Sequence, residues 1–170
     1  ADRLPDVDAL YLGGGYPELH AGALSSSRCR GDLRRAADDG MPVYAECGGL
    51  IYLSERLTAD GADYPMAGIL PATAEMTGRI QALGYVEARV AGGAPVLAPG
   101  SLFRGHEFHY SRLECARDAR FALELSRGRG IDEGRDGLAA GSAVGQYTHA
   151  YFTDEFAQTL VKAAAGFRRS

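Results

Sequence analysis

Lysine, net positive charge and long apolar runs are what this sequence has least of. Of its 18 basic residues only Lys162 is a lysine, which we attribute to compositional bias, and 22 acidic residues bring the net charge to −4. Nucleic-acid binding requires clustered positive charge, so nucleic acid is not an expected partner. No apolar run approaches the roughly 20 residues that cross a bilayer, and no signal peptide is visible, so no membrane is expected either.

Cysteine is also scarce. The three cysteines have unrelated spacings that form neither a disulfide framework nor a zinc knuckle, and we expect a cytoplasmic protein. No Gly-x-x-x-x-Gly-Lys-Ser/Thr segment occurs, so the sequence carries no P-loop. With 170 residues, 46% of them hydrophobic, the chain suits one compact domain. Because it starts without methionine, we expect a piece of a longer chain.

Apolar strands and helical stretches alternate in the first third of the chain. Residues 7–12 and 43–46 are predicted to form buried strands. Residues 18–39 are predicted to form a helix that ends at Gly40, and residues 49–57 a second helix. This order predicts an α/β fold with a parallel crossover, in which functional groups gather at the carboxyl ends of the strands.

The rest of the chain has short alternating stretches with Gly and Pro between them. Residues 79–90 and 104–113 are predicted as antiparallel strands, and residues 143–148 as a further strand. Residues 127–141 are rich in Gly, Arg and Asp and are predicted to form a mobile surface connection. A closing amphipathic helix is predicted over residues 154–167, with Thr153 as its cap.

Cys47 is the candidate nucleophile. It ends an apolar run, with Ala45 two places before it and Gly49 two places after it, which is the form of a nucleophile elbow between a strand and a helix. The free N–H groups at the start of the following helix favour a thiolate there. The alternative is a small, buried core cysteine.

A base and an oxyanion site are predicted at the same edge of the sheet. His149 follows a predicted strand, so a parallel sheet places it on the same rim as Cys47. The glycine run Gly13, Gly14, Gly15 follows the first strand. Its backbone N–H groups, with that of Gly48, can approach an oxyanion closely. The alternative for the glycines is a tight turn without a binding role.

Residues 105–111 form a second polar segment. Strand alternation places Glu107, His109 and Ser111 on one face and the other residues on the opposite face. The odd spacing of its two histidines argues against a two-histidine metal site, and no metal is expected. Glu107 and His109 are candidates for binding a polar substrate, and the alternative is an ordinary half-exposed strand.

Four segments carry a resemblance to a known family. In chain order they are Leu-Gly-Gly-Gly-Tyr-Pro-Glu (12–18), Ala-Glu-Cys-Gly-Gly-Leu-Ile-Tyr-Leu (45–53), Gly-His-Glu-Phe-His-Tyr-Ser (105–111) and Tyr-Thr-His-Ala-Tyr-Phe (147–152). They resemble the C-terminal glutaminase domains of the cobyrinate a,c-diamide synthases, class I glutamine amidotransferases of vitamin B12 biosynthesis. The connecting segment 82–88 is also similar, so the resemblance covers nearly the whole chain. The sister family, cobyric acid synthase, differs at the first and third segments.

The resemblance implies a fold and a reaction. The fold is a three-layer, flavodoxin-like α/β arrangement with a mostly parallel central sheet, flanking helices and an antiparallel extension. Cys47, with His149 as base, attacks the side-chain amide of glutamine. Backbone N–H groups near Gly14, Gly15 and Gly48 hold the oxyanion, and a glutamyl thioester is hydrolysed. Residues 1–170 then form a glutaminase domain without a cofactor of its own.

The resemblance also implies a partner. The ammonia passes to an N-terminal synthetase domain, absent from this chain, which binds ATP, Mg and the corrinoid and amidates the a and c carboxylates of cobyrinic or hydrogenobyrinic acid. Open alternatives are a non-catalytic docking module of the same fold, a glutaminase domain of cobyric acid synthase or another tetrapyrrole amidase, and another cysteine hydrolase.

One position departs from the wider class. Class I domains typically carry a glutamate two residues after the histidine, which orients the imidazole, and here that position is Tyr151. Glu46 and Glu107 are candidates for an orienting acid, and the sequence does not choose between them.

Overall fold

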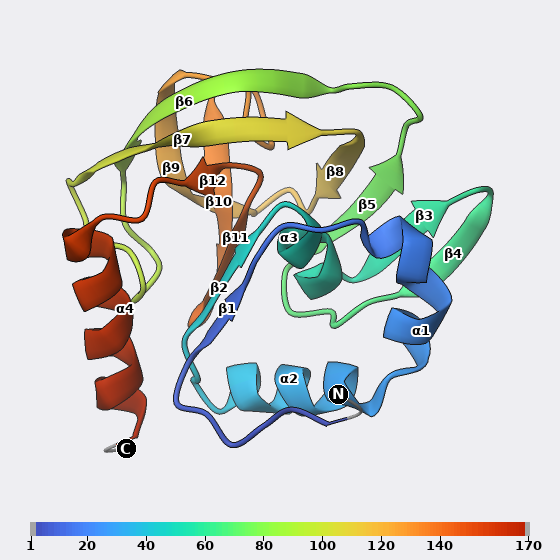
Figure 1. Cartoon of the computed structure of the whole chain (residues 1–170), viewed down its shortest axis with the longest axis horizontal. Coiled ribbons are helices and arrows are strands. Elements are labelled where there is room, and N and C mark those ends of the chain that lie inside the picture. The colour runs from blue at the N-terminus through green and yellow to red at the C-terminus, as the bar shows by residue number, and fades with distance from the viewer. Residues whose placement is uncertain (1–2, 169–170) are drawn as a thin grey trace.

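The computed structural model describes residues 3–168 as two sheets with helices packed around them (Figure 1). The larger sheet has the strand order β1-β2-β11-β10-β9-β6-β7-β12, and the smaller β4-β3-β5-β8. The strands of the larger sheet are β1 (Leu10–Leu12), β2 (Val43–Glu46), β11 (Ala143–Gln146), β10 (Arg135–Ala140), β9 (Arg120–Arg127), β6 (Ala82–Val90), β7 (Leu102–His109) and β12 (His149–Ala150). Those of the smaller sheet are β4 (Ala62–Pro65), β3 (Arg56–Ala59), β5 (Ala72–Met76) and β8 (Ser111–Cys115).

Five helical elements complete the described part of the chain. They are the 3₁₀ helix η1 (Pro17–His20), α1 (Ala21–Ser26), α2 (Arg28–Asp38), α3 (Gly48–Leu53) and α4 (Asp154–Phe167). In residues 3–168 no helix is both long enough and apolar enough to cross a membrane.

The larger sheet is mixed. Strands β1, β2 and β11 are parallel to one another, and β11, β10, β9, β6, β7 and β12 are paired antiparallel in that order. The expected α/β class and antiparallel extension are confirmed, whereas the parallel part is smaller than "mostly parallel" implies. Only Gly141 and Ser142 separate β10 from β11, and so short a connection can only return the chain antiparallel.

Two hydrophobic cores lie on opposite faces of the parallel strands. Val43 and Ala45 point into one core with Leu33 of α2 and Leu50 of α3. Tyr44 points into the other, which includes Val144 and Leu123 of the sheet and Phe156 of α4. Successive residues of a strand face opposite sides, so β2 is buried along its whole length. This is the three-layer arrangement that the family resemblance implies.

Several predicted elements are confirmed. Strand β2 has the predicted bounds, α4 spans residues 154–167, and the Thr153 side chain accepts a hydrogen bond from the backbone N–H of Phe156 as its cap. Gly40, in the left-handed region at φ 94°, follows the end of α2 as predicted. The first strand is shorter than predicted, and the predicted helix 18–39 is divided at Ser27, whose hydroxyl caps α2 by accepting from the N–H of Cys29.

Three predictions are wrong. The helix over residues 49–57 ends at Leu53, and residue 56 begins the hairpin of β3 and β4. The strand 104–113 is broken at Tyr110, so that β7 and β8 belong to different sheets. Residues 127–141 contain β10, a strand inside the larger sheet with Leu138 fully buried, where a mobile surface connection was expected.

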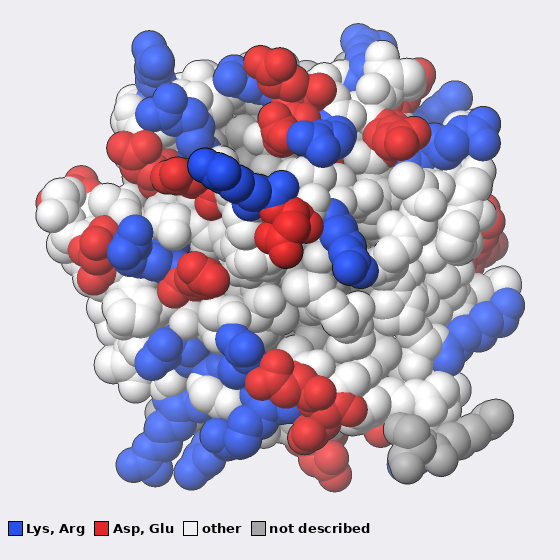
Figure 2. Space-filling view, turned by 180° about the vertical axis from the view of Figure 1, so that it is seen from behind, with Lys and Arg blue, Asp and Glu red and all other residues white. Residues whose placement is uncertain are grey.

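Surface charges of both signs lie close together. Arg34 and Asp38 pair within α2, and Arg112 of β8 pairs with Glu75 of β5. The face turned away from the viewer of Figure 1 shows the same mixture of positive and negative side chains (Figure 2). Exposed pairs of this kind stabilise a fold by at most about 1 kcal/mol each.

Candidate active site

The three parallel strands end at a common rim. Gly13, Gly14 and Gly15 follow β1, Cys47 follows β2, and β11 leads through Tyr147 and Thr148 to His149. The N–H of Cys47 donates to the carbonyl of Gln146 at 2.7 Å, which joins the ends of β2 and β11 directly. The rim expected from the sequence is therefore present, and it brings the cysteine, the histidine and the glycine run together.

Cys47 has a strained backbone between β2 and α3. Its φ of 46° and ψ of −100° lie in a region that non-glycine residues rarely occupy, at a cost of about 1–3 kcal/mol. The residues that follow must be glycines because the backbone of the β1 loop lies against them. A Cβ on Gly48 would lie 2.7 Å from the carbonyl oxygen of Gly15, and one on Gly49 2.6 Å from that of Leu12. This geometry is that of a nucleophile elbow.

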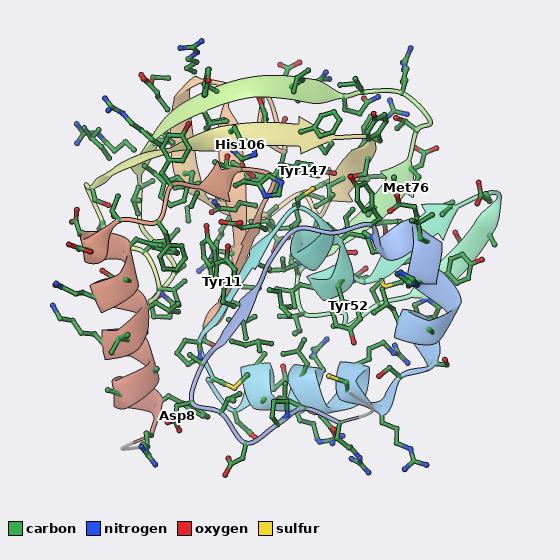
Figure 3. All side chains as sticks on the ribbon, viewed as in Figure 1. Asp8, Tyr11, Tyr52, Met76, His106 and Tyr147 are labelled. Atoms are coloured by element: carbon green, nitrogen blue, oxygen red, sulfur yellow. The ribbon has the colours of Figure 1, made fainter. Side chains whose placement is uncertain are left out.

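A cavity of about 480 Å³ opens at this elbow. Cys47 and His149 line it together with Gly14 and Gly15 of the β1 loop. The other lining residues come from η1, α3, β5 and the β7–β8 segment: Tyr16, Pro17, Glu18, Ile51, Met76, His106, Phe108, His109, Tyr110 and Ser111. In Figure 3, His106 of β7 lies to the left of α3, and Met76 at the end of β5 lies to the right of α3.

His149 lies between Cys47 and the carboxylate of Glu46. The neighbouring side chains of Cys47 and Glu46 raise the pKa of His149 to about 9, against the opposing effect of burial. Its Nδ1 is 3.7 Å from Oε2 of Glu46, an ion-pair separation. The imidazole stacks on His106 with ring centroids 5.0 Å apart. Near neutral pH, His149 is therefore protonated and able to donate a proton to a leaving group.

Glu46 is a buried carboxylate with several donors. Its Oε1 accepts hydrogen bonds from the N–H of Ala150 at 2.9 Å and from the hydroxyl of Tyr44 at 2.9 Å, and its Oε2 accepts from the hydroxyl of Tyr11 at 2.8 Å. Burial alone raises the pKa of this carboxyl group, but His149, the N–H of Ala150 and the two tyrosines outweigh burial and lower the pKa. Glu46 therefore carries a negative charge beside His149.

Glu107 and His109 face inward from β7. The Glu107 carboxylate is buried and accepts hydrogen bonds from the N–H groups of Arg129 and Gly130 at 2.7 and 2.9 Å, and Glu107 is not among the residues that line the cavity. His109 lines the cavity and stacks on Tyr147, with ring centroids 3.5 Å apart. Burial lowers the pKa of His109. Strand β7 is buried on this face and exposed on the other, as the alternative of an ordinary half-exposed strand predicts.

Asp136 is an important residue that the sequence analysis missed. It is fully buried on β10 and accepts hydrogen bonds from the N–H groups of Tyr147 and Thr148 and from the hydroxyl of Thr148. These contacts fix the segment that leads to His149. Burial raises the pKa of Asp136 to about 6, although the hydrogen bonds oppose the shift. An Asp-Gly pair in a glycine-rich segment indicates a turn, so the sequence gives no signal for this role.

Comparisons with known proteins show the family to which the chain belongs. A family model described as the CobB/CobQ-like glutamine amidotransferase domain matches residues 1–156. A cobyrinate a,c-diamide synthase of Haloarcula marismortui is 48% identical over 151 residues, which are 88% of this chain and 34% of the relative. One of Methanothermobacter thermautotrophicus is 42% identical over 170 residues, 99% of this chain and 36% of the relative. The chain thus spans about a third of the length of these curated relatives.

Solved structures agree on the fold. A structure titled as a glutamine amidotransferase superimposes with a TM-score of 0.67 at 16% identity, covering 93% of this chain and 79% of that one. PurLQS from Thermotoga maritima gives a TM-score of 0.65 at 15% identity, covering 98% and 82%.

Proposed function

This chain belongs to the CobB/CobQ-like glutamine amidotransferase family, and from that premise we propose that its cavity hydrolyses glutamine to glutamate and ammonia. The observation that carries the proposal is the elbow itself. A strained cysteine lines the same cavity as a histidine whose pKa it raises, and the backbone of the β1 loop lies against the residue that follows the cysteine. Acyl transfer needs this combination of nucleophile, base and nearby backbone N–H groups.

The proposed reaction uses these groups in turn. His149 holds the proton of Cys47, and the thiolate attacks the side-chain amide carbon of glutamine. The tetrahedral oxyanion is stabilised by backbone N–H groups near Gly14, Gly15 and Gly48. Collapse of the intermediate expels ammonia, which takes the proton from His149, and leaves a glutamyl thioester on Cys47. Water, deprotonated by His149, then attacks the thioester, and glutamate is released as the thiolate forms again.

We further propose that the ammonia is used by an ATP-dependent synthetase domain. The relatives are named cobyrinate a,c-diamide synthase, and this chain matches only about a third of their length. The remaining two thirds is where we place the binding of ATP, Mg²⁺ and the corrinoid. The whole protein would then amidate the a and c carboxylates of cobyrinic or hydrogenobyrinic acid.

Apolar side chains beside the cavity support a docked domain. Tyr16 and Phe108 line the cavity and are 63% and 38% exposed. Leu83, the partner of Phe108 across the β6–β7 pair, and Tyr85, the partner of His106, share the outward face of these strands and are 70% and 61% exposed. We call Leu83, Tyr85 and Phe108 the β6–β7 patch. A docked domain that covers this patch would shield the cavity mouth from bulk water.

Substitution of Cys47 tests the proposal. In the complete native polypeptide, Cys47→Ala should abolish glutamate release and glutamine-dependent amidation, while amidation supplied with an ammonium salt continues. Cys115→Ala, which removes a half-buried thiol outside the cavity, serves as the matched control and should keep both activities.

The outcomes separate the possible roles of Cys47. Loss of both kinds of amidation in Cys47→Ala would show that Cys47 is structural. A glutamine-analogue electrophile such as 6-diazo-5-oxo-L-norleucine should label Cys47 alone. Failure of selective labelling would point to a docking module without catalysis.

A further inference from the structure

The position that usually orients the histidine in class I domains does not do so here. Tyr151 is 53% exposed, and its side chain lines a different cavity, formed with Thr153 and Phe156 of the α4 region. Its N–H donates to the carbonyl of Arg104, which keeps this part of the chain against β7. His149 therefore needs an acid from elsewhere in the fold.

We propose that Glu46 is the positioning residue for His149. Its Oε2 faces Nδ1 of the imidazole, so the other ring nitrogen, Nε2, is left to exchange the proton with Cys47. The inference rests on the proposed glutaminase function, because it assigns a role within that reaction. It also means that nucleophile and orienting acid are consecutive residues at the end of β2.

The surroundings of Glu46 keep its carboxylate charged and fixed. Tyr11 and Tyr44 lie on neighbouring parallel strands, stack with ring centroids 5.3 Å apart, and both donate to the carboxylate. The pKa of each phenol is raised, through burial first and then through Glu46, so both remain protonated donors. The N–H of Ala150 binds the same carboxylate, which ties it to the strand that carries His149.

Glu107, the other candidate acid, is occupied elsewhere. Both of its carboxylate oxygens accept from the backbone of residues 129–130, and the imidazole nearest to it is that of His109, at 3.9 Å. Glu107 therefore holds the loop after β9 and is not placed to orient His149.

The pH dependence of the reaction tests this role. Glu46→Gln keeps the shape of the side chain and an acceptor for Ala150 but removes the charge. In the complete native polypeptide, kcat for glutamate release should fall on the order of 10²-fold or more, with KM for glutamine little changed. The alkaline limb of the pH profile, set by His149 with a pKa of about 9, should move toward neutral pH by about one unit or more, because an opposite charge is lost.

Two further variants are controls, and a third tests the role of Glu46 independently. Glu46→Asp keeps the charge and should keep the alkaline limb. Tyr151→Ala lies outside the cavity and should leave the whole profile unchanged. Tyr11→Phe removes a hydrogen-bond donor to Glu46, so it should raise the pKa of this carboxyl group. Because a protonated Glu46 cannot hold His149, the acidic limb should move to higher pH while the alkaline limb stays in place. This variant gives an answer even where Glu46→Gln does not fold.

Two results would overturn the inference in different ways. If the wild type releases glutamate and Glu46→Gln retains the wild-type alkaline limb, Glu46 does not position His149. If the wild type neither releases glutamate nor reacts with 6-diazo-5-oxo-L-norleucine at Cys47, the proposed function itself fails, and this inference fails with it.

Discussion

Individual glycines set the distances in the cavity. Gly48 packs on the backbone of Gly15, and Gly14 packs on the ring of His149, where an added Cβ would lie 2.5 Å from Cε1. These contacts place the backbone of the β1 loop beside both the nucleophile and the base. Gly48 and Gly14 must be glycines because an added Cβ would meet the backbone of Gly15 or the ring of His149. The reason is space and not an unusual backbone conformation.

We predict that Gly48→Ala strongly reduces catalysis. Its Cβ must push the β1 loop away from Cys47, and displacement of catalytic groups by about 1 Å can cost about 10²-fold in rate. The measurement is kcat/KM for glutamate release in the complete native polypeptide. Gly22→Ala in α1 is the matched control, since a Cβ there meets nothing within 4 Å, and its activity should equal that of the wild type. A fully active Gly48→Ala protein would contradict the need for this backbone contact.

The sequence predicts some site residues much better than others. Cys47, His149 and the glycine run each follow a strand, so the rule that parallel strands end at one rim is enough to group them. Choosing Glu46 over Glu107 requires the register of β2 against β11 and of β12 against β7, because each glutamate is adjacent in the sequence to a cavity residue, Glu46 to Cys47 and Glu107 to His106. Local spacing does not contain that register.

At the scale of elements, β10 connects the antiparallel strands to the site. It pairs with β11 and β9, and through Asp136 it binds the segment between β11 and β12. Its sequence, Arg-Asp-Gly-Leu-Ala-Ala, hides this role because Asp and Gly are depleted in strands. Gly137 has a φ of 69° and interrupts the alternation of the strand, so the period of two that identifies a strand is missing.

We predict that Asp136 makes the stability of the fold fall as pH rises through about 6. Its folded pKa of about 6 lies above the ordinary value of 3.8, so its contribution is fully present below about pH 3.8 and is lost as the folded group ionises. Asp136→Asn removes this dependence. The free energy of unfolding of the wild type relative to Asp136→Asn should therefore decrease by on the order of 3 kcal/mol between pH 4 and pH 7.

Urea unfolding of both proteins across this range measures the difference, and groups that titrate identically in the two proteins cancel. A relative stability that instead increases with pH would show that the hydrogen bonds to Asp136 hold it charged, and would contradict the prediction.

The molecule as a whole joins a parallel half to an antiparallel half, and the cavity lies where they meet. Cys47 and the glycine run come from the parallel strands, while His106 and the carbonyl of Phe108, 3.8 Å from the sulfur of Cys47, come from β7. In Figure 1, β6 and β7 arch over the ends of β1 and β2. The sequence predicts the parallel strands and the antiparallel pair β6–β7. It does not predict β9 and β10, or the curl of the sheet, which depends on the long-range pairs β9–β6 and β7–β12.

This arrangement makes the β6–β7 patch the place to test domain coupling. Leu83→Glu adds a charge to the outward face of β6, and the substituted side chain is already exposed, so we expect the free energy of unfolding to change by less than about 0.5 kcal/mol. In the complete native polypeptide, glutamine-dependent amidation should fall at least several-fold, while amidation supplied with an ammonium salt should continue at the wild-type rate.

Leu102→Glu is the matched control for this surface. Leu102 is 74% exposed on the same face of the same strand pair, and its partner Arg89 is six residues from Leu83 along β6, a separation of about 20 Å. Because only Leu83 borders the residues at the cavity mouth, Leu102→Glu should leave both kinds of amidation unchanged. Equal losses in the two variants would indicate a general effect of added charge on the sheet, and no loss in Leu83→Glu would place the docked domain on another face.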